Sequence, residues 1–258
     1  MRRNIKRIMK AMFGLMLVPM IGMSAAAQNC CDGNDCSAWC DDNSSSCGDG
    51  CCYRSGDFFG EFQYLRLKAF DTDGYNEGLG SDDGFRLIGG YQNCNGLGIR
   101  GRYFDFDGVQ NVGGDEYGLD VSYFDVEVTQ SFSLCKLDGV VSGGYRHAEH
   151  QVVYESDLDG DFDGDGVTLG IQLQRDINCN LGLYGWAQHS ILVGDDAEES
   201  DDYIIGWTEV QLGTQYATCV GQYDVFARGG VEAQFHDGPA GGYEFGLLGW
   251  FLSAGVNF

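Results

Sequence analysis

From Gly60 to Phe258 the sequence repeats segments of about ten residues in which apolar side chains alternate with polar or small ones. An alternation with period two is typical of a half-buried strand, whereas a helical stripe would recur every three to four residues. In residues 223–235 one phase is apolar or small from Tyr223 onward, while the other contains Asp224, Arg228 and Glu232. The pattern predicts an all-β fold whose strands have one apolar face and one charged face.

Two architectures use such strands, the soluble β-sandwich and the transmembrane β-barrel. The lengths of the connections between strands distinguish the two architectures. Short turns alternate here with longer acidic stretches, as the periplasmic turns and outer loops of membrane barrels do. The short turns centre on Cys94, Cys135, Cys179 and Cys219, and the acidic stretches are 71–83, 107–118, 155–165, 194–202 and 236–242. The asymmetry favours the barrel and leaves a secreted β-sandwich binding module as the alternative.

The alternation predicts ten strands, and we expect residues 58–258 to form an antiparallel up-and-down transmembrane barrel of about ten strands. An even number of strands returns both ends of the barrel to the same side of the membrane. The expected strands cover 60–70, 84–92, 97–106, 119–132, 139–154, 166–175, 181–193, 203–216, 222–235 and 243–258.

The residues before the barrel read as two segments. Five basic residues, an apolar stretch from Ala11 to Met23 and three alanines ending at Ala27 predict a signal peptide over 1–27. Residues 28–57 then form a Cys-rich periplasmic head or linker with too few apolar side chains for a core. The segment has no C-x-x-C pair of the kind that would indicate a zinc site, so we expect disulfides. The odd number of thiols suggests that one of them bonds to another envelope protein or to a second copy. The candidates are Cys30, Cys31, Cys36, Cys40, Cys47, Cys51 and Cys52.

The last strand ends on Phe258 and resembles the sorting signal read by the bacterial barrel assembly machinery. We therefore expect the outer membrane as the location, its lipid as a partner and the assembly machinery as a partner during biogenesis. A formal net charge of −24 argues against nucleic acid, whose phosphates require Lys and Arg.

Strand phasing places a set of charged and polar side chains in the barrel interior. Ten strands enclose a narrow lumen, since water-filled porins have about sixteen. Opposite charges there should pair, either as a structural plug or as the lining of a small solute path. The expected lumen residues are Arg86, Arg100, Arg102, Arg146, Arg228, Asp125, Glu127, Glu209, Glu232 and Gln188.

An acidic stretch matches the opening of a calcium loop, D-x-D-x-D-G, but Gly170 stands where the bidentate Glu belongs. The pattern predicts weak Ca²⁺ binding by an acidic loop and no other cofactor. The residues of this expected cation loop are Asp157, Asp159, Asp161, Asp163 and Asp165.

The histidines predict no catalytic site. His147, His150, His189 and His236 belong to no nucleophile motif. His189 and Ser190 are consecutive on a strand, so their side chains point to opposite faces and cannot form a dyad. We expect no enzymatic activity.

Two stretches resemble the Legionella-type major outer-membrane protein family, namely residues 161–170 (DFDGDGVTLG) and 183–194 (LYGWAQHSILVG), with further echoes at 84–86, 90–91 and 141–146. The resemblance covers about residues 60–258 and implies a pore-forming outer-membrane barrel. Members often carry Arg where this chain has Gln188. The expected function is thus a structural envelope component or a narrow pore for small solutes, with a plugged, disulfide- or cation-linked envelope protein as the alternative.

Overall fold

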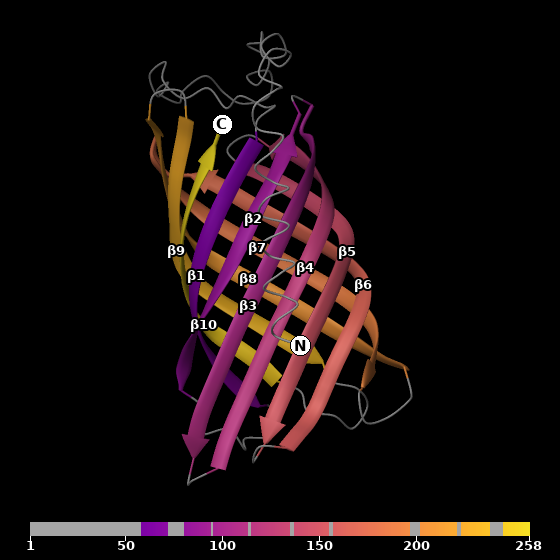
Figure 1. Ribbon diagram of the computed structural model, residues 1–258. Helices are drawn as coiled ribbons and strands as arrows, with labels where there is room; N and C mark the ends of the chain where they lie inside the picture. Colours follow the sequence, from indigo (N-terminus) through magenta and orange to yellow (C-terminus); the bar gives the residue numbers. More distant parts are fainter. Residues whose placement is uncertain are drawn as a thin grey trace.

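The computed structural model describes residues 58–71, 80–93, 95–112, 115–134, 137–154, 157–196, 202–220, 223–237 and 245–258. They form ten strands that close into an antiparallel up-and-down barrel, each strand pairing with its neighbours in sequence and β1 with β10 (Figure 1). The predicted fold class is confirmed, and a sandwich is ruled out because the sheet closes on itself. The strands are β1 Phe58–Asp71, β2 Ser81–Gln92, β3 Leu97–Val112, β4 Asp115–Leu134, β5 Leu137–Tyr154, β6 Asp157–Asp176, β7 Leu181–Asp196, β8 Asp202–Val220, β9 Tyr223–Asp237 and β10 Phe245–Asn257.

The barrel closes where β1 meets β10. The register runs from Phe59 opposite Asn257 to Asp71 opposite Phe245, and the amide of Phe258 donates to the carbonyl of Phe58 at 2.8 Å. Both ends of the barrel therefore lie on one side, as an even strand number requires. The expected signal peptide (1–27) and the whole of the expected head (28–57) precede this seam and lie outside the described residues.

The outer surface carries an apolar band of membrane dimensions. On β6 the outward side chains Val167, Leu169 and Ile171 are all exposed, and charged Asp165 and Arg175 stand on either side of this stretch. Ten residues at about 3.3 Å each, tilted by about 40°, span about 25 Å, the height of the apolar band of an outer-membrane barrel. The exposed apolar side chains thus face lipid, and the molecule is an outer-membrane barrel.

No helix among the described residues is long and apolar enough to cross a membrane.

Two of the short turns, those after β2 and β6, share one construction, and they lie at the end that faces the periplasm in outer-membrane barrels. After β2 the Asn93 side-chain oxygen accepts hydrogen bonds from the amides of Asn95 and Leu97, and after β6 Asn178 holds the amides of Asn180 and Leu181 in the same way. Such Asx bonds replace the ladder bonds that a tight turn gives up. Cys179 and Cys219, at this end of the barrel, are both disulfide-bonded.

Two acidic stretches that the sequence placed in loops belong to strands. β3 continues to Val112 and β4 begins at Asp115, while β6 begins at Asp157. The loops expected over 107–118 and 155–165 are therefore wrong as to structure. The physical reason is that an antiparallel ladder can continue into water, where both faces of a hairpin accept charged side chains, and the alternation D-x-D-x-D itself has the strand period.

Candidate functional site

The interior of the barrel is filled by side chains in two layers. β1 shows the change along one strand, since Glu61 and Gln63 near its periplasmic end give way to Leu65 and Leu67. We call the periplasmic part the polar layer and the part beyond it the apolar layer. The apolar layer contains Leu65, Leu67, Phe104, Phe106, Val121, Tyr123, Phe162, Leu192, Ile205, Trp207 and Leu247, each at most 5% exposed.

The polar layer contains equal numbers of positive and negative side chains among the described residues. Five guanidinium groups lie beside five carboxylates, so the formal charge of the layer is zero. An isolated buried ion costs several kcal/mol, and pairing offsets that cost. The guanidinium groups belong to Arg86, Arg100, Arg102, Arg146 and Arg228, and the carboxylates to Glu61, Asp125, Glu127, Glu209 and Glu232.

Arg86 of β2 extends across the interior to the opposite wall. Its Nη2 lies 2.7 Å from Glu232 and 3.0 Å from Glu209, on β9 and β8. Its Nη1 donates to Gln63 at 2.8 Å and to Glu232 at 3.1 Å, and its Nε donates to the Tyr123 hydroxyl at 2.9 Å. These five bonds match the five N–H donors of a guanidinium. The lumen is thereby bridged from wall to wall.

Arg146 of β5 forms the second cross-connection. It bonds Asp125 on the neighbouring strand through two nitrogens, and its Nη2 also lies 2.7 Å from Glu209 on β8. Its guanidinium carbon stands 3.8 Å from the centre of the Tyr123 ring, within the range of a cation–π contact. Glu209 therefore joins the two long-range arginines into one network.

Arg100 and Arg102 of β3 share one carboxylate. Glu127 accepts from Arg100 Nε through one oxygen and from Arg102 Nη2 through the other, both at 2.7 Å. The Gln188 amide of β7 donates to Glu127 at 3.1 Å and also to Thr168. Gln188 thus adds a neutral donor to a carboxylate that two cations already balance.

Arg228 and Glu61 form the pair nearest the periplasmic end. Arg228 Nη1 lies 2.7 Å from Glu61, and its Nε donates to Gln215 at 2.6 Å. Tyr184 and Phe226 stand on its faces, each ring centre 4.4 Å from the guanidinium carbon. This pair closes the barrel below the central network.

Little free space remains between these groups. A cavity of about 10 Å³ in the polar layer holds at most about one water molecule. It is lined by Gln63, Arg86, Ile88, Arg100, Arg102, Gln172, Tyr184, Trp186 and Gln211. A hydrated ion does not fit this cavity without displacing side chains.

The remaining residues singled out from the sequence lie apart from this network. Asp157, Asp159, Asp161, Asp163 and Asp165 are all in β6 rather than in a loop, and Asp163 and Asp165 are exposed on the outside. His189 faces outward and contacts the Thr208 hydroxyl, whereas Ser190 is buried and donates to Thr168, so they form no dyad. Phe258 follows β10 at the closing seam, and the head cysteines lie outside the described residues.

Sequence reasoning missed two parts of the interior. Glu61, the partner of Arg228, was not singled out, although its phase on the first strand would have found it. The apolar layer was also missed, because an inward apolar side chain looks the same in sequence as a lipid-facing one until the phase of its strand is fixed.

Comparison with known proteins identifies no family for this chain. No family model matches it, and no curated protein does. Membership of the Legionella-type family is therefore not shown.

Solved structures that resemble it include outer-membrane barrels of low similarity. Neisserial surface protein A is 13% identical with a TM-score of 0.37, covering 78% of this chain and 95% of its own. The attachment invasion locus protein Ail of Yersinia pestis is 13% identical with a TM-score of 0.37, covering 79% and 99%. The β domain of the Bordetella autotransporter BrkA is 14% identical with a TM-score of 0.43, covering 79% and 99%. At this level of similarity, nothing about binding or activity transfers to this chain.

Proposed function

We propose that the protein is a structural component of the outer membrane whose barrel is closed by its own side chains. The observation that carries the proposal is the charge-balanced polar layer, in which five guanidinium groups and five carboxylates bridge the walls. Small membrane barrels have interiors just wide enough for side chains to fill, whereas water-filled channels belong to barrels of about sixteen or more strands. The apolar layer adds a second barrier, because an ion crossing it would lose its hydration and meet few polar side chains, among them the buried His236.

Planar-bilayer conductance of the refolded barrel tests the closed state. We expect silent membranes at high protein load for the wild-type chain. A matched variant replaces Arg86, Arg146, Glu209 and Glu232 with Ser, which removes the central network and leaves its net charge unchanged. This variant should produce conductance steps if it folds, which heat-modifiable gel mobility checks. Steps from the wild-type barrel would overturn the proposal.

A narrow pore, which the resemblance to the Legionella-type family implies, is the second candidate. The small polar cavity beside Arg86 and Arg102 favours it, since a solute path would start from such a space. In that case the apolar layer would act as the gate, and Trp207, which is fully buried there, would be part of it. Trp207→Ala separates the two candidates: a gated pore would begin to conduct, whereas a plug formed by the polar layer would stay silent.

Membrane lipid is the direct partner in this proposal. The proposal includes two further partners. They are the assembly machinery, expected from Phe258, and the disulfide partners, expected from the head cysteines. Non-reducing electrophoresis of whole envelopes tests the disulfide partners, and a purely monomeric band would remove them from the proposal. We assign the chain no catalytic role.

A further inference from the structure

Four side chains with metal-binding atoms form a block on the outer face of β5 and β6. The register places His147 opposite Asp165 and Glu149 opposite Asp163. His147 and Glu149 are two residues apart on one strand, as Asp163 and Asp165 are on the other, so all four point to the same side of the sheet. Two hydrogen-bonded strands therefore hold a nitrogen donor and three carboxylates in a fixed square.

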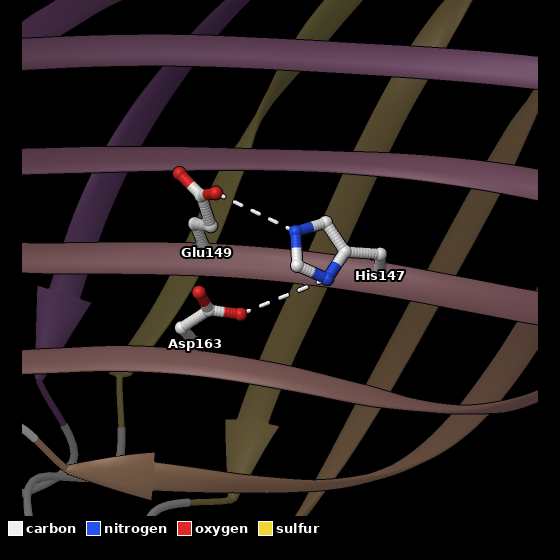
Figure 2. Close-up of side chains that lie close together, drawn as sticks. All are labelled: His147, Glu149 and Asp163. Carbon is white, nitrogen blue, oxygen red and sulfur yellow. Dashed lines mark ion pairs between the residues drawn. The ribbon is translucent and has the colours of Figure 1, made fainter. Parts of the chain in front are cut away.

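The distances within this block suit a single ion. Glu149 Oε1 lies 3.4 Å from His147 Nε2, and Asp163 Oδ1 lies 3.7 Å from His147 Nδ1. Figure 2 marks both ion pairs with dashed lines. One ligand atom from each of these three residues lies within 4.8 Å of the other two. Two ligands bound at about 2.1 Å to one zinc ion stand about 3.0–3.4 Å apart. Because one ion can take only one of the two imidazole nitrogens, the Asp163 carboxylate must turn from Nδ1 toward Nε2 for all three donors to reach the same ion.

The fourth side chain, Asp165, holds the His147 imidazole in the orientation and tautomer that metal binding requires. Asp165 lies 3.0 Å from His147 Nδ1 and also accepts a hydrogen bond from the Tyr145 hydroxyl. A carboxylate on one ring nitrogen holds the proton there and leaves the lone pair of the other nitrogen for a metal. Nε2, the nitrogen that faces Glu149, is thus the ligand, and Asp165 is a positioning residue.

The block also lacks charge balance without a cation. Glu149 and Asp163 are like charges directly opposite each other on adjacent strands, an arrangement that destabilises a sheet. Elsewhere on this outer surface, Arg66 pairs with Asp83 at 2.8 Å. A divalent ion between Glu149 and Asp163 would convert their repulsion into two attractions.

The position of the block makes it accessible from the outer water phase. Tyr145 opposite Val167 ends the continuous exposed apolar stretch on β5 and β6, and His147 opposite Asp165 is the next outward pair toward the end away from the short turns. All four side chains of the block are at least partly exposed. They therefore lie where the apolar band ends.

We propose that His147, Glu149 and Asp163 bind one divalent transition-metal ion at the outer edge of the membrane. The nitrogen ligand selects Zn²⁺, Cu²⁺ or Ni²⁺ over Ca²⁺ and Mg²⁺, which prefer all-oxygen sites. The site shares Asp163 with the Ca²⁺ loop expected from the sequence, and it differs from that loop in its ion, its other two ligands and its strand geometry.

Zinc binding to the refolded full chain in detergent, measured by calorimetry with all free thiols alkylated, tests the site. We expect one Zn²⁺ whose affinity falls at least about tenfold in His147→Gln and about 10–100-fold in Asp165→Asn, because positioning carboxylates have effects of that size. Excess Ca²⁺ should not displace the Zn²⁺. Cu²⁺ bound in place of Zn²⁺ should show nitrogen coupling in its electron paramagnetic resonance spectrum, and His147→Gln should abolish it.

His189→Gln is the matched control, since His189 is also outward-facing but has the Thr208 hydroxyl rather than a carboxylate as its partner. Its zinc affinity should equal that of the wild type. Equal zinc affinity in wild type and His147→Gln, with both variants folded by heat-modifiable mobility, would overturn the proposal. Displacement of the Zn²⁺ by equimolar Ca²⁺ would also overturn it.

Discussion

Arg146 and Asp125 face each other across β5 and β4, and the guanidinium donates to both carboxylate oxygens, at 2.7 and 2.9 Å. Both side chains are fully buried, so neither charge can return to water when its partner is removed. A two-point bond of this kind fixes orientation as well as distance. It ties the wall strands to the network that spans the interior.

Arg146→Met should destabilise the barrel by about 3–5 kcal/mol, the usual cost of leaving a buried carboxylate without its partner. Asp125 and Glu209 both lose a contact in this variant. Arg66→Met is the matched control, because Arg66 and Asp83 form an exposed pair that contributes at most about 1 kcal/mol. Urea unfolding in detergent, followed by tryptophan fluorescence, measures both. Equal costs would show that the interior network adds nothing to stability.

Leu169→Arg should cost about 2–4 kcal/mol in a lipid bilayer, because Leu169 lies in the middle of the apolar band and is 69% exposed. Ile204→Arg should cost only about 0–1 kcal/mol, since Ile204 pairs with Val193, which is opposite the boundary residue Asp165. Reversible unfolding from vesicles measures the difference. If the two variants were equally stable, lipid would not be the environment of this face.

Gly144→Ala should destabilise the barrel by about 1–3 kcal/mol, the cost of forcing an extra methyl group into a packed site. A Cβ there would stand 2.0 Å from the carbonyl oxygen of Val126 on the neighbouring strand β4, so the backbone must move. Gly60→Ala is the control, because a Cβ at that glycine meets nothing within 4 Å. Thermal unfolding of both variants should show a loss for the first and none for the second.

Glu149→Gln should change the stability of the barrel in opposite directions with and without metal. In a chelating buffer it removes the repulsion from Asp163 and stabilises by about 0.2–1 kcal/mol, as relief of a like-charge cross-strand pair does. In zinc it removes a ligand and lowers the melting temperature relative to wild type. Melting curves in both buffers check the change of sign, and the same sign in both would contradict it.

The strand pattern of the barrel was predictable because each strand must show one face to lipid and one to the interior. The alternation around Arg228 and Glu232 fixed the phase of β9, and both side chains lie inside. Strand ends were not predictable where the ladder leaves the membrane, as at Val112 and Asp157, because water imposes no alternation there. The partners of Arg86 were also hidden, since they come from strands about 120 and 150 residues later and depend on the curvature of the wall.

The metal-binding block was hidden for a similar reason. In the sequence, Asp163 and Asp165 belong to the expected Ca²⁺ loop, and His147 and Glu149 are merely two positions apart in another strand. They become a site only through the register that places the two pairs opposite each other. A one-residue slip would have turned one pair to the other face of the sheet.

The wall-to-wall bonds of Arg86 have a consequence for biogenesis. Its carboxylate partners lie on β8 and β9, so a nascent chain that has inserted only its first five strands would carry four interior guanidinium groups against three carboxylates. Such an intermediate holds an uncompensated cation in contact with hydrocarbon, which is strongly unfavourable. The interior becomes neutral only when the second half of the chain has inserted. A sheet of the first five strands alone is therefore not stable in the bilayer.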